Sequence, residues 1–290
     1  MHKLTETDIF ALLPARAKEA HKGNFGRVTA VCGSRTYRGA AILAVQAALR
    51  AGTGIVRLAS IEPVIAACAA RTAAAIYLPL AESETGGIAA ENARAICEAL
   101  APTDVCLVGC GLGASAASKN LVARLLAYAP CSLILDADAL RVTSQNTAQL
   151  RGAKGDVCIT PHLGEFARLI GQTVDEIGAN APFLASEFAK THGIVVVLKS
   201  HITYIASPDG TVVCSDVGNP GLAKGGSGDL LAGLIAGFAA QGHSLFDAAC
   251  IGVWLAGASA DLCAARKSEY AMLPGEQLDD LCTLFLKHGL

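Results

Sequence analysis

Short, almost continuously apolar segments alternate with longer, alanine-rich segments along most of the chain. Continuous runs of Val, Ile and Leu are typical of strands buried on both faces of a parallel sheet. The pattern predicts strands at residues 28–32, 55–59, 75–80, 105–108, 133–135, 157–159 and 194–198. It predicts helices between them at 40–51, 88–100, 117–128, 164–169 and 174–190. We therefore expect a doubly wound sheet with helices on both faces.

The pattern changes near the end of the predicted sheet. Residues 202–206 and 211–215 flank the turn sequence Pro208-Asp209-Gly210 and predict a β-hairpin. A glycine-rich segment follows, and residues 230–240 and 245–264 then predict apolar helices packed on the sheet. We find no internal repeat or linker, so a single domain over residues 1–290 is expected.

The composition and the net charge favour a small molecule as the partner of this protein. The 290 residues are 52% hydrophobic and 17% charged, which suits one large α/β core. The formal net charge of -2 provides no electrostatic attraction to nucleic acid or to an anionic membrane. Mean hydropathy is +0.45, which raises the question of membrane insertion. However, the longest apolar stretch that we expect after Asp229 is residues 230–240, which is too short to span a bilayer. The N-terminal segment contains Glu6, Asp8 and Glu19 and has no continuous apolar core, so it does not read as a secretory signal, and we expect a cytoplasmic protein.

The cysteines predict no disulfide framework. There are 11 of them, an odd number, scattered along the chain without a C-x-x-C pair. Cys106 and Cys110 are assigned to an apolar strand. We expect buried, reduced thiols that act as small hydrophobic side chains.

The segment from Asn219 to Asp229 carries the clearest chemical signal. It has four glycines between Gly221 and Gly228 and leads directly into a predicted helix. Such a turn lets backbone N–H groups converge at a helix N-terminus, where they bind phosphate or stabilise a transferred phosphoryl group. Asp229 lies beside that anion site, where it can take a proton from an attacking hydroxyl. The alternative is that Asp229 only caps the helix.

The order of the motifs resembles that of the NAD(P)H-hydrate dehydratases, which are relatives of ribokinase and hydroxyethylthiazole kinase. The stretch 219–233, NPGLAKGGSGDLLAG, carries the strongest likeness. The other matching segments are HKGNFGR at 21–27, GS at 33–34, YRGAA at 37–41, AGTG at 51–54, GCGLG at 109–113, DADAL at 136–140, TPHLGE at 160–165 and KSHIT at 199–203. Together these segments cover nearly the whole chain in the order of the family.

The resemblance implies a ribokinase-like three-layer α/β/α sandwich and a repair reaction. The enzyme would restore NADH or NADPH from the S-epimer of its hydrate, NADHX or NADPHX, with ADP or ATP as co-substrate. With ADP, the products would include AMP and phosphate. A magnesium ion would neutralise the phosphates.

The resemblance also implies roles for individual residues. Asp229 would act as general base, and Gly226, Ser227 and Gly228 would stabilise the transferred phosphoryl group. The hydrated dinucleotide would be held by Ala40, Gly111, His162 and Asp229. The nucleotide would be held by Lys199, Ser200, His201, Ile202, Thr203 and Gly228.

Each of these roles has a simpler alternative. His162 follows a strand and a proline, where a histidine can merely close a loop. Lys199 can be an ordinary lysine at a strand end with its ammonium group in water. Asp136 and Asp138 are equally compatible with hydrogen bonds to loop amides and with a place near the metal or substrate.

The chain departs from the family pattern at three positions. Cys110 stands where proline is common, Leu222 where methionine is common, and Lys224 where threonine is common. We expect Lys224 to add a positive charge beside the anion site and to influence the choice between ADP and ATP. The chain also lacks the N-terminal epimerase domain of some relatives, so a separate epimerase is expected. Relatives are often tetramers, which makes a homo-oligomer the expected assembly.

Two other functions remain open from the sequence. A small-molecule kinase of the same superfamily would use the same aspartate and glycine turn, and would release a stable phosphorylated alcohol. A nucleotide-binding regulatory protein would keep the fold without turnover. The presence of both Asp229 and the whole glycine turn argues against the second alternative.

Overall fold

The computed structural model describes residues 1–290, except for the side chain of residue 179. All the strands belong to one 10-stranded sheet in the order β1-β10-β9-β8-β7-β6-β5-β2-β3-β4. The strands are β1 His2–Lys3, β2 Arg27–Val31, β3 Ile55–Ile61, β4 Ile76–Leu80, β5 Val105–Val108, β6 Ser132–Leu135, β7 Val157–Ile159, β8 Val195–Leu198, β9 Thr203–Ala206 and β10 Val212–Ser215. Neighbouring strands run parallel from β8 to β4, whereas β9 is antiparallel to both β8 and β10.

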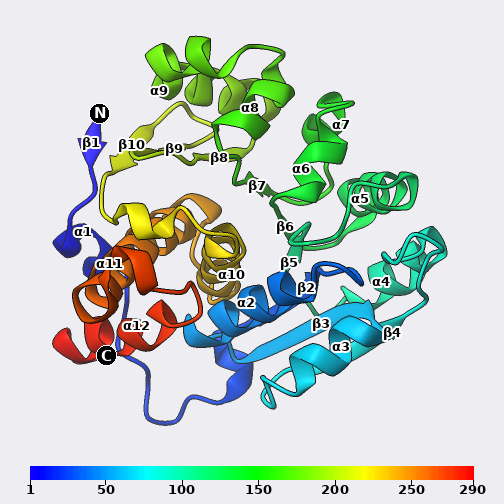
Figure 1. Cartoon of the computed structure of the whole chain (residues 1–290), viewed down its shortest axis with the longest axis horizontal. Helices are drawn as coiled ribbons and strands as arrows, with labels where there is room; N and C mark the ends of the chain where they lie inside the picture. The colour runs from blue at the N-terminus through cyan, green and yellow to red at the C-terminus, as the bar shows by residue number, and fades with distance from the viewer.

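Helices cover both faces of this sheet. The α-helices are α1 Glu6–Ala11, α2 Arg38–Arg50, α3 Glu62–Ala69, α4 Ala93–Ala99, α5 Ala116–Tyr128, α6 Asp138–Thr143, α7 Ala148–Arg151, α8 Leu163–Ile170, α9 Val174–His192, α10 Ser227–Ala240, α11 Leu245–Ala271 and α12 Gln277–Lys287. Short 3-10 helices are η1 Lys22–Phe25, η2 Ala90–Asn92 and η3 Pro220–Leu222. Helices α2, α10, α11 and α12 lie on one side of the sheet, and α5, α6, α8 and α9 lie on the other (Figure 1).

The three-layer α/β/α architecture predicted from the sequence is confirmed. Each predicted strand is present within two residues of its expected ends, and the hairpin β9–β10 turns at residues 207–211. The segment predicted as one helix at 88–100 instead forms η2 and the shorter α4. Helices α1, α3, α6, α7 and α12 were not predicted. In α3, Pro63 occupies the first turn, where a proline starts a helix and does not break it.

The helix predicted at residues 245–264 was too short. Helix α11 has 27 residues and a mean hydropathy of 1.5 in its most apolar 18-residue window, so it is long and apolar enough to cross a membrane. However, 78% of that window is buried inside the protein. The apolar side chains of α11 therefore form part of the core.

Two glycines in α10 allow this helix to lie directly against α2. A Cβ atom on Gly233 would lie 2.3 Å from the carbonyl oxygen of Ala44, and one on Gly237 would lie 2.6 Å from Cβ of Ala51. Any larger residue at either position would push the two helices apart. This close packing fixes the N-terminus of α10, which carries Asp229 at the edge of the sheet.

Candidate functional site

A cavity of about 880 Å3 lies at the carboxyl ends of the central strands. Asp136 follows β6, His162 follows β7 and Lys199 follows β8, and all three line the cavity. Parallel strands that end at one edge of a sheet bring such residues together, although they are far apart in the sequence. The other side of the cavity is lined by the segment 217–229, which comprises the connection from the hairpin and the first residues of α10.

The floor of the cavity contains a buried ion pair. Oδ1 of Asp136 accepts hydrogen bonds from Nζ of Lys199 at 2.9 Å and from Oγ1 of Thr160 at 2.6 Å. Asp136 is only 2% exposed, so its carboxylate depends on these donors for stabilisation. Burial alone would lower the pKa of Lys199, but the nearby carboxylates of Asp136 and Glu165 outweigh that effect and raise the pKa. Lys199 is therefore a fixed cation.

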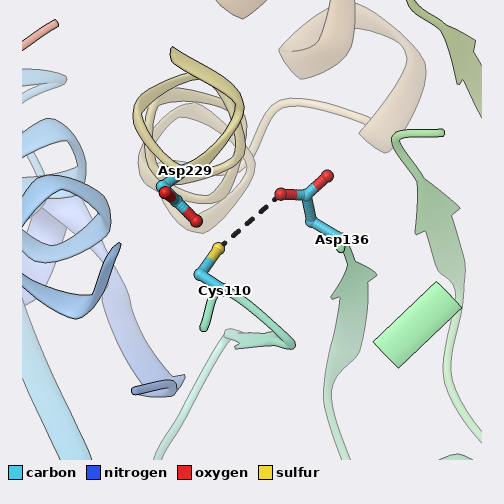
Figure 2. A group of neighbouring side chains, drawn as sticks. All are labelled: Cys110, Asp136 and Asp229. Carbon is cyan, nitrogen blue, oxygen red and sulfur yellow. Dashed lines mark hydrogen bonds between the residues drawn. The ribbon is translucent and has the colours of Figure 1, made fainter. Parts of the chain in front are cut away.

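Asp229 faces this ion pair from the first turn of α10. Its side chain and those of Asp136 and Cys110 converge from three different elements (Figure 2). Burial, together with the negative charge of Asp136, raises the pKa of Asp229 from 3.8 to about 6. A carboxylate with this pKa remains ionised at neutral pH and is a stronger base than an ordinary aspartate.

The glycine turn before Asp229 forms an anion-binding helix N-terminus. Gly226 has a φ of +103°, in the left-handed region that favours glycine, and it caps the helix. The first intrahelical bond runs from Leu230 N–H to the Gly226 carbonyl, so the N–H groups of Gly228 and Asp229 precede the helical ladder and are free to bind an anion. The Oγ atom of Ser227 is buried without a hydrogen-bond partner in the described structure. Ser227, Gly228 and Asp229 all line the cavity, so these donors are available to a ligand there.

His162 has a structural role in addition to its place in the cavity. Its Nδ1 accepts hydrogen bonds from the backbone N–H groups of Gly164 and Glu165, at 3.0 and 3.3 Å, and so caps α8. Burial and the charge of Lys199 lower the pKa of His162, which favours the neutral imidazole with a proton on Nε2. A neutral Nε2–H group is a hydrogen-bond donor available to a bound ligand.

The predicted nucleotide segment 199–203 is only partly exposed to the cavity. Lys199, Ser200, His201 and Thr203 line it, whereas Ile202 is not among the lining residues. The Ile202 carbonyl accepts a hydrogen bond of 2.6 Å from Ser200 Oγ, which closes the turn between β8 and β9. Ile202 therefore contributes to the shape of the turn.

Ala40 and Gly111, two of the predicted substrate residues, are not among the residues that line the cavity. They lie together at a second place beside it. A Cβ atom on Gly111 would lie 2.8 Å from Cβ of Ala40 and 2.7 Å from Cβ of Tyr37, so the loop after β5 touches the start of α2 here. Gly111 directly follows Cys110, whose Sγ lies 3.8 Å from Oδ2 of Asp136. Cys110 thus lies between Gly111 and the cavity residue Asp136.

Two expectations from the sequence are corrected by this geometry. Cys110 is not in a strand, because β5 ends at Val108 and the cysteine lies in the loop beside Asp136. Lys224 does not place its charge at the anion site, because its Nζ donates to the carbonyls of Glu269, Tyr270 and Met272. A lysine next to a glycine turn gives no sign in the sequence of which way its side chain points.

The other cysteines are as predicted. All 11 are free thiols, and most are buried. Cys110 lies at the candidate site: its Sγ and one oxygen each of Asp136 and Asp229 lie within 4.8 Å of one another. A hydrogen bond with the neighbouring thiol of Cys32, together with burial, keeps the pKa of Cys110 well above its ordinary value, so the thiol is protonated.

One acidic residue of the site was missed as a functional residue. Glu165 lines the cavity, and its Oε2 accepts a hydrogen bond of 2.8 Å from the backbone N–H of His162. Burial raises the pKa of Glu165, and its negative charge contributes to holding Lys199 in the charged form. In the sequence, Glu165 reads as the second half of a capping box, which explains its backbone contact but not its place in the cavity.

Comparison with known proteins agrees with this geometry. The family profile described as NAD(P)H-hydrate dehydratase matches residues 28–282. A bifunctional NAD(P)H-hydrate repair enzyme from Moorella thermoacetica is 40% identical over 269 residues, which are 93% of this chain and 51% of that protein. The chain therefore spans about half the length of such bifunctional relatives. An ADP-dependent (S)-NAD(P)H-hydrate dehydratase from Neisseria meningitidis is 36% identical over 251 residues, 86% of this chain and 80% of that protein.

The fold comparison leads to the same family. The ADP/ATP-dependent NAD(P)H-hydrate dehydratase from Bacillus subtilis, co-crystallised with ATP/Mg2+, superposes with a TM-score of 0.84 at 31% identity, covering 99% of this chain and 98% of that one. This match confirms the ribokinase-like form of the sandwich. Because the profile covers most of its length and the relatives are more than 30% identical to it, the chain belongs to the NAD(P)H-hydrate dehydratase family.

Proposed function

We propose that this chain is a nucleotide-dependent dehydratase that restores NADH and NADPH from the S-epimers of their hydrates. The observation that carries the proposal is the position of Asp229, a carboxylate with a pKa of about 6 at the N-terminus of α10. The free N–H groups of the glycine turn adjoin it, and Gly228 of that turn also lies close to the Lys199–Asp136 pair. This arrangement combines a base with an anion site, as phosphoryl transfer to a hydroxyl requires.

The chain's own residues would act in two steps. First, Asp229 takes the proton from the ring hydroxyl of the hydrate while the hydroxyl oxygen bonds to the terminal phosphorus of ADP and the bond to AMP breaks. The N–H groups of Gly228 and Asp229 stabilise the charge on the transferred group. Second, the carbon–oxygen bond breaks with the help of the ring nitrogen lone pair, and phosphate leaves. Loss of a ring proton then completes the dihydronicotinamide.

The two ligands would lie on opposite sides of the glycine turn. We assign the nucleotide to the segment 199–203, where Lys199 provides a fixed positive charge. We assign the hydrated dinucleotide to Ala40, Gly111 and His162, with its ring hydroxyl at Asp229. The contact of Cys110 with Asp136 lies between the two places and supports this division.

Magnesium is part of the proposal, and the residues present fit it. Mg2+ prefers oxygen ligands and is often held by one or two carboxylates together with substrate phosphates. Oδ1 of Asp136 is bound by Lys199 and Thr160, whereas Oδ2 accepts only the long bond of 3.8 Å from the Cys110 thiol, so Oδ2 is the oxygen that would hold the ion. When bound, the ion would neutralise charge on the nucleotide phosphates.

We also propose that the enzyme is a cytoplasmic homo-oligomer, with a tetramer as its form, built from one catalytic domain over residues 1–290. Large apolar side chains on the surface support an assembly: Phe183 is 64% exposed, Leu286 75% and Tyr270 96%. An epimerase that converts the other epimer of the hydrate would supply substrate. Sedimentation of the purified protein tests the oligomeric state.

The reaction is tested by incubating the protein with NADPH hydrate, magnesium and either ADP or ATP. We expect reduced-nicotinamide absorbance to return, with one phosphate released for each NADPH formed. Release of a stable phosphorylated alcohol from an added sugar or thiazole, without recovery of NADPH, would instead identify a kinase. Nucleotide binding without any product would identify a regulatory protein.

A further inference from the structure

Lys224 directly precedes the glycine turn, residues 225–228. Its ammonium group is nevertheless bound to the segment 268–274, where the chain leaves α11 on its way to α12; we call this segment the reversal. Its Nζ donates to the carbonyl oxygens of Glu269 at 3.2 Å, Tyr270 at 2.8 Å and Met272 at 2.6 Å. An ammonium group has three N–H donors, so all of them are used. We propose that Lys224 is a positioning residue, which fixes the glycine turn in the geometry that binds the transferred phosphoryl group. This inference rests on the proposed function.

The reversal that Lys224 binds has an unusual backbone. Ser268 has a φ of +68° and a ψ of 156°, a conformation that non-glycine residues rarely adopt. Such a conformation is costly and persists only where the surrounding contacts fix it. One fixing contact is the hydrogen bond from Met272 N–H to the Ser268 carbonyl at 3.1 Å. The three bonds from Lys224 fix the same short segment from the side of the cavity.

The loop before α10 also packs closely on this segment. A Cβ atom on Gly221 would lie 2.4 Å from Sδ of Met272, so only glycine fits there. A Cβ atom on Gly226 would lie 2.5 Å from Cδ1 of Leu43 and 3.6 Å from Cγ of Pro274. The glycine turn is therefore held between α2 and the reversal, and a shift of either support moves the N–H groups that face the ligand.

Loss of the Lys224 bonds should affect the turn more than the fold. Glu269 and Tyr270 are exposed, so water can replace the ammonium group at two of the three carbonyls, whereas Met272 is buried. Water bound at those carbonyls would not connect the glycine turn to the reversal as the Lys224 side chain does. Since displacement of a binding group by about 1 Å can cost up to roughly a hundredfold in rate, the effect should be largest on the chemical step.

The test compares three variants with the wild-type protein. Lys224→Met keeps the apolar stem and removes the donors, and Lys224→Arg restores donors at nearly the same place. Lys267→Met is the matched control, because Lys267 pairs with Glu276 at 2.8 Å near the same reversal but does not line the cavity. Two measurements are made: kcat and KM for the nucleotide, and hydrogen–deuterium exchange of the backbone amides of residues 225–229.

We expect Lys224→Met to lower kcat by about tenfold or more, with a smaller change in KM, and to accelerate exchange at residues 225–229. Lys224→Arg should restore most of kcat, and Lys267→Met should resemble wild type in both measurements. Unchanged exchange and kcat in Lys224→Met would overturn the inference, as would equal effects in Lys267→Met. If the wild-type protein restores no NADPH, the proposed function fails, while the exchange measurement still decides whether Lys224 fixes the turn.

Discussion

The ammonium group of Lys199 lies 2.9 Å from Oδ1 of Asp136, and the side chains of the two residues are only 20% and 3% exposed. The pair joins the ends of β6 and β8, two strands separated by β7 in the sheet. Its charges are therefore held in place before any ligand binds. A site arranged in this way needs little reorganisation when negative charge develops on a phosphoryl group.

Removal of Lys199 should destabilise the protein. In Lys199→Met, the buried carboxylate of Asp136 loses its charged partner, which typically costs about 3–5 kcal/mol. Unfolding in urea should show this loss, and the double variant with Asp136→Asn should recover part of it. Lys190→Met is the control, because Lys190 forms an exposed ion pair with Glu187 that is worth about 0.5 kcal/mol or less. Equal stability of the two lysine variants would contradict the account of the buried pair.

The activity should depend on pH through Asp229. The base must be ionised, and its pKa is about 6, so kcat/KM should fall about tenfold per pH unit below that value and level off above it. The measurement is kcat/KM for the hydrate between pH 5 and pH 8. A rate that stays constant down to about pH 5 would show that a group of ordinary aspartate pKa, or no base at all, controls the step.

The same pKa predicts a stability effect of the opposite sign to that of most carboxylates. The folded state holds the Asp229 proton more tightly than the unfolded state, because the pKa is raised from 3.8 to about 6. Stability contributed by this group is present below pH 3.8 and is lost as pH rises through 6. Asp229→Asn should therefore exceed wild type in free energy of unfolding by up to about 3 kcal/mol at pH 7.5, and by much less at pH 4. A variant less stable than wild type at pH 7.5 would contradict this prediction.

A methyl group at position 228 should block the nucleotide without disturbing the fold. A Cβ atom on Gly228 would lie 3.4 Å from Nζ of Lys199 and 3.7 Å from Oδ2 of Asp136, so the protein can accommodate it. It would nevertheless project toward the phosphate position. Gly228→Ala should raise the dissociation constant of ADP by at least about tenfold, measured by calorimetry. Gly152→Ala, where the nearest atom lies at 3.9 Å, is the control.

Most of the fold could be predicted from the sequence, because buried parallel strands leave a continuous apolar signal. The strands from Val105 to Val108 and from Val157 to Ile159 were predicted with their observed ends. The helix Gln277–Lys287 was missed because it follows another helix and no strand marks either of its ends, although it buries Leu278, Leu281 and Leu284 in the core. The start of α11 at Leu245 was predicted, but its C-terminal end was missed because the apolar segment continues into a charged end of the helix.

The candidate site could be predicted only in part, from the types of residue that follow the predicted strands. Asp229 and the glycine turn were found because glycines before a helix have few other uses. The pairing of Asp136 with Lys199, and the place of Cys110 between two carboxylates, depend on three-dimensional contacts between segments 24 or more residues apart. The direction of the Lys224 side chain depends on a chain reversal about 45 residues later, which no local pattern reveals.

The most direct test of the account is the recovery of NADPH from its hydrate by wild type, Asp229→Asn and Asp247→Asn, each with ADP and magnesium. Asp247 lies in the first turn of α11, as Asp229 does in α10, but it is not among the residues that line the cavity. We expect wild type and Asp247→Asn to restore NADPH at similar rates and Asp229→Asn to be slower by roughly 10²–10⁴-fold. Recovery of NADPH by Asp229→Asn at the wild-type rate would contradict the role of Asp229 on which the proposed function rests.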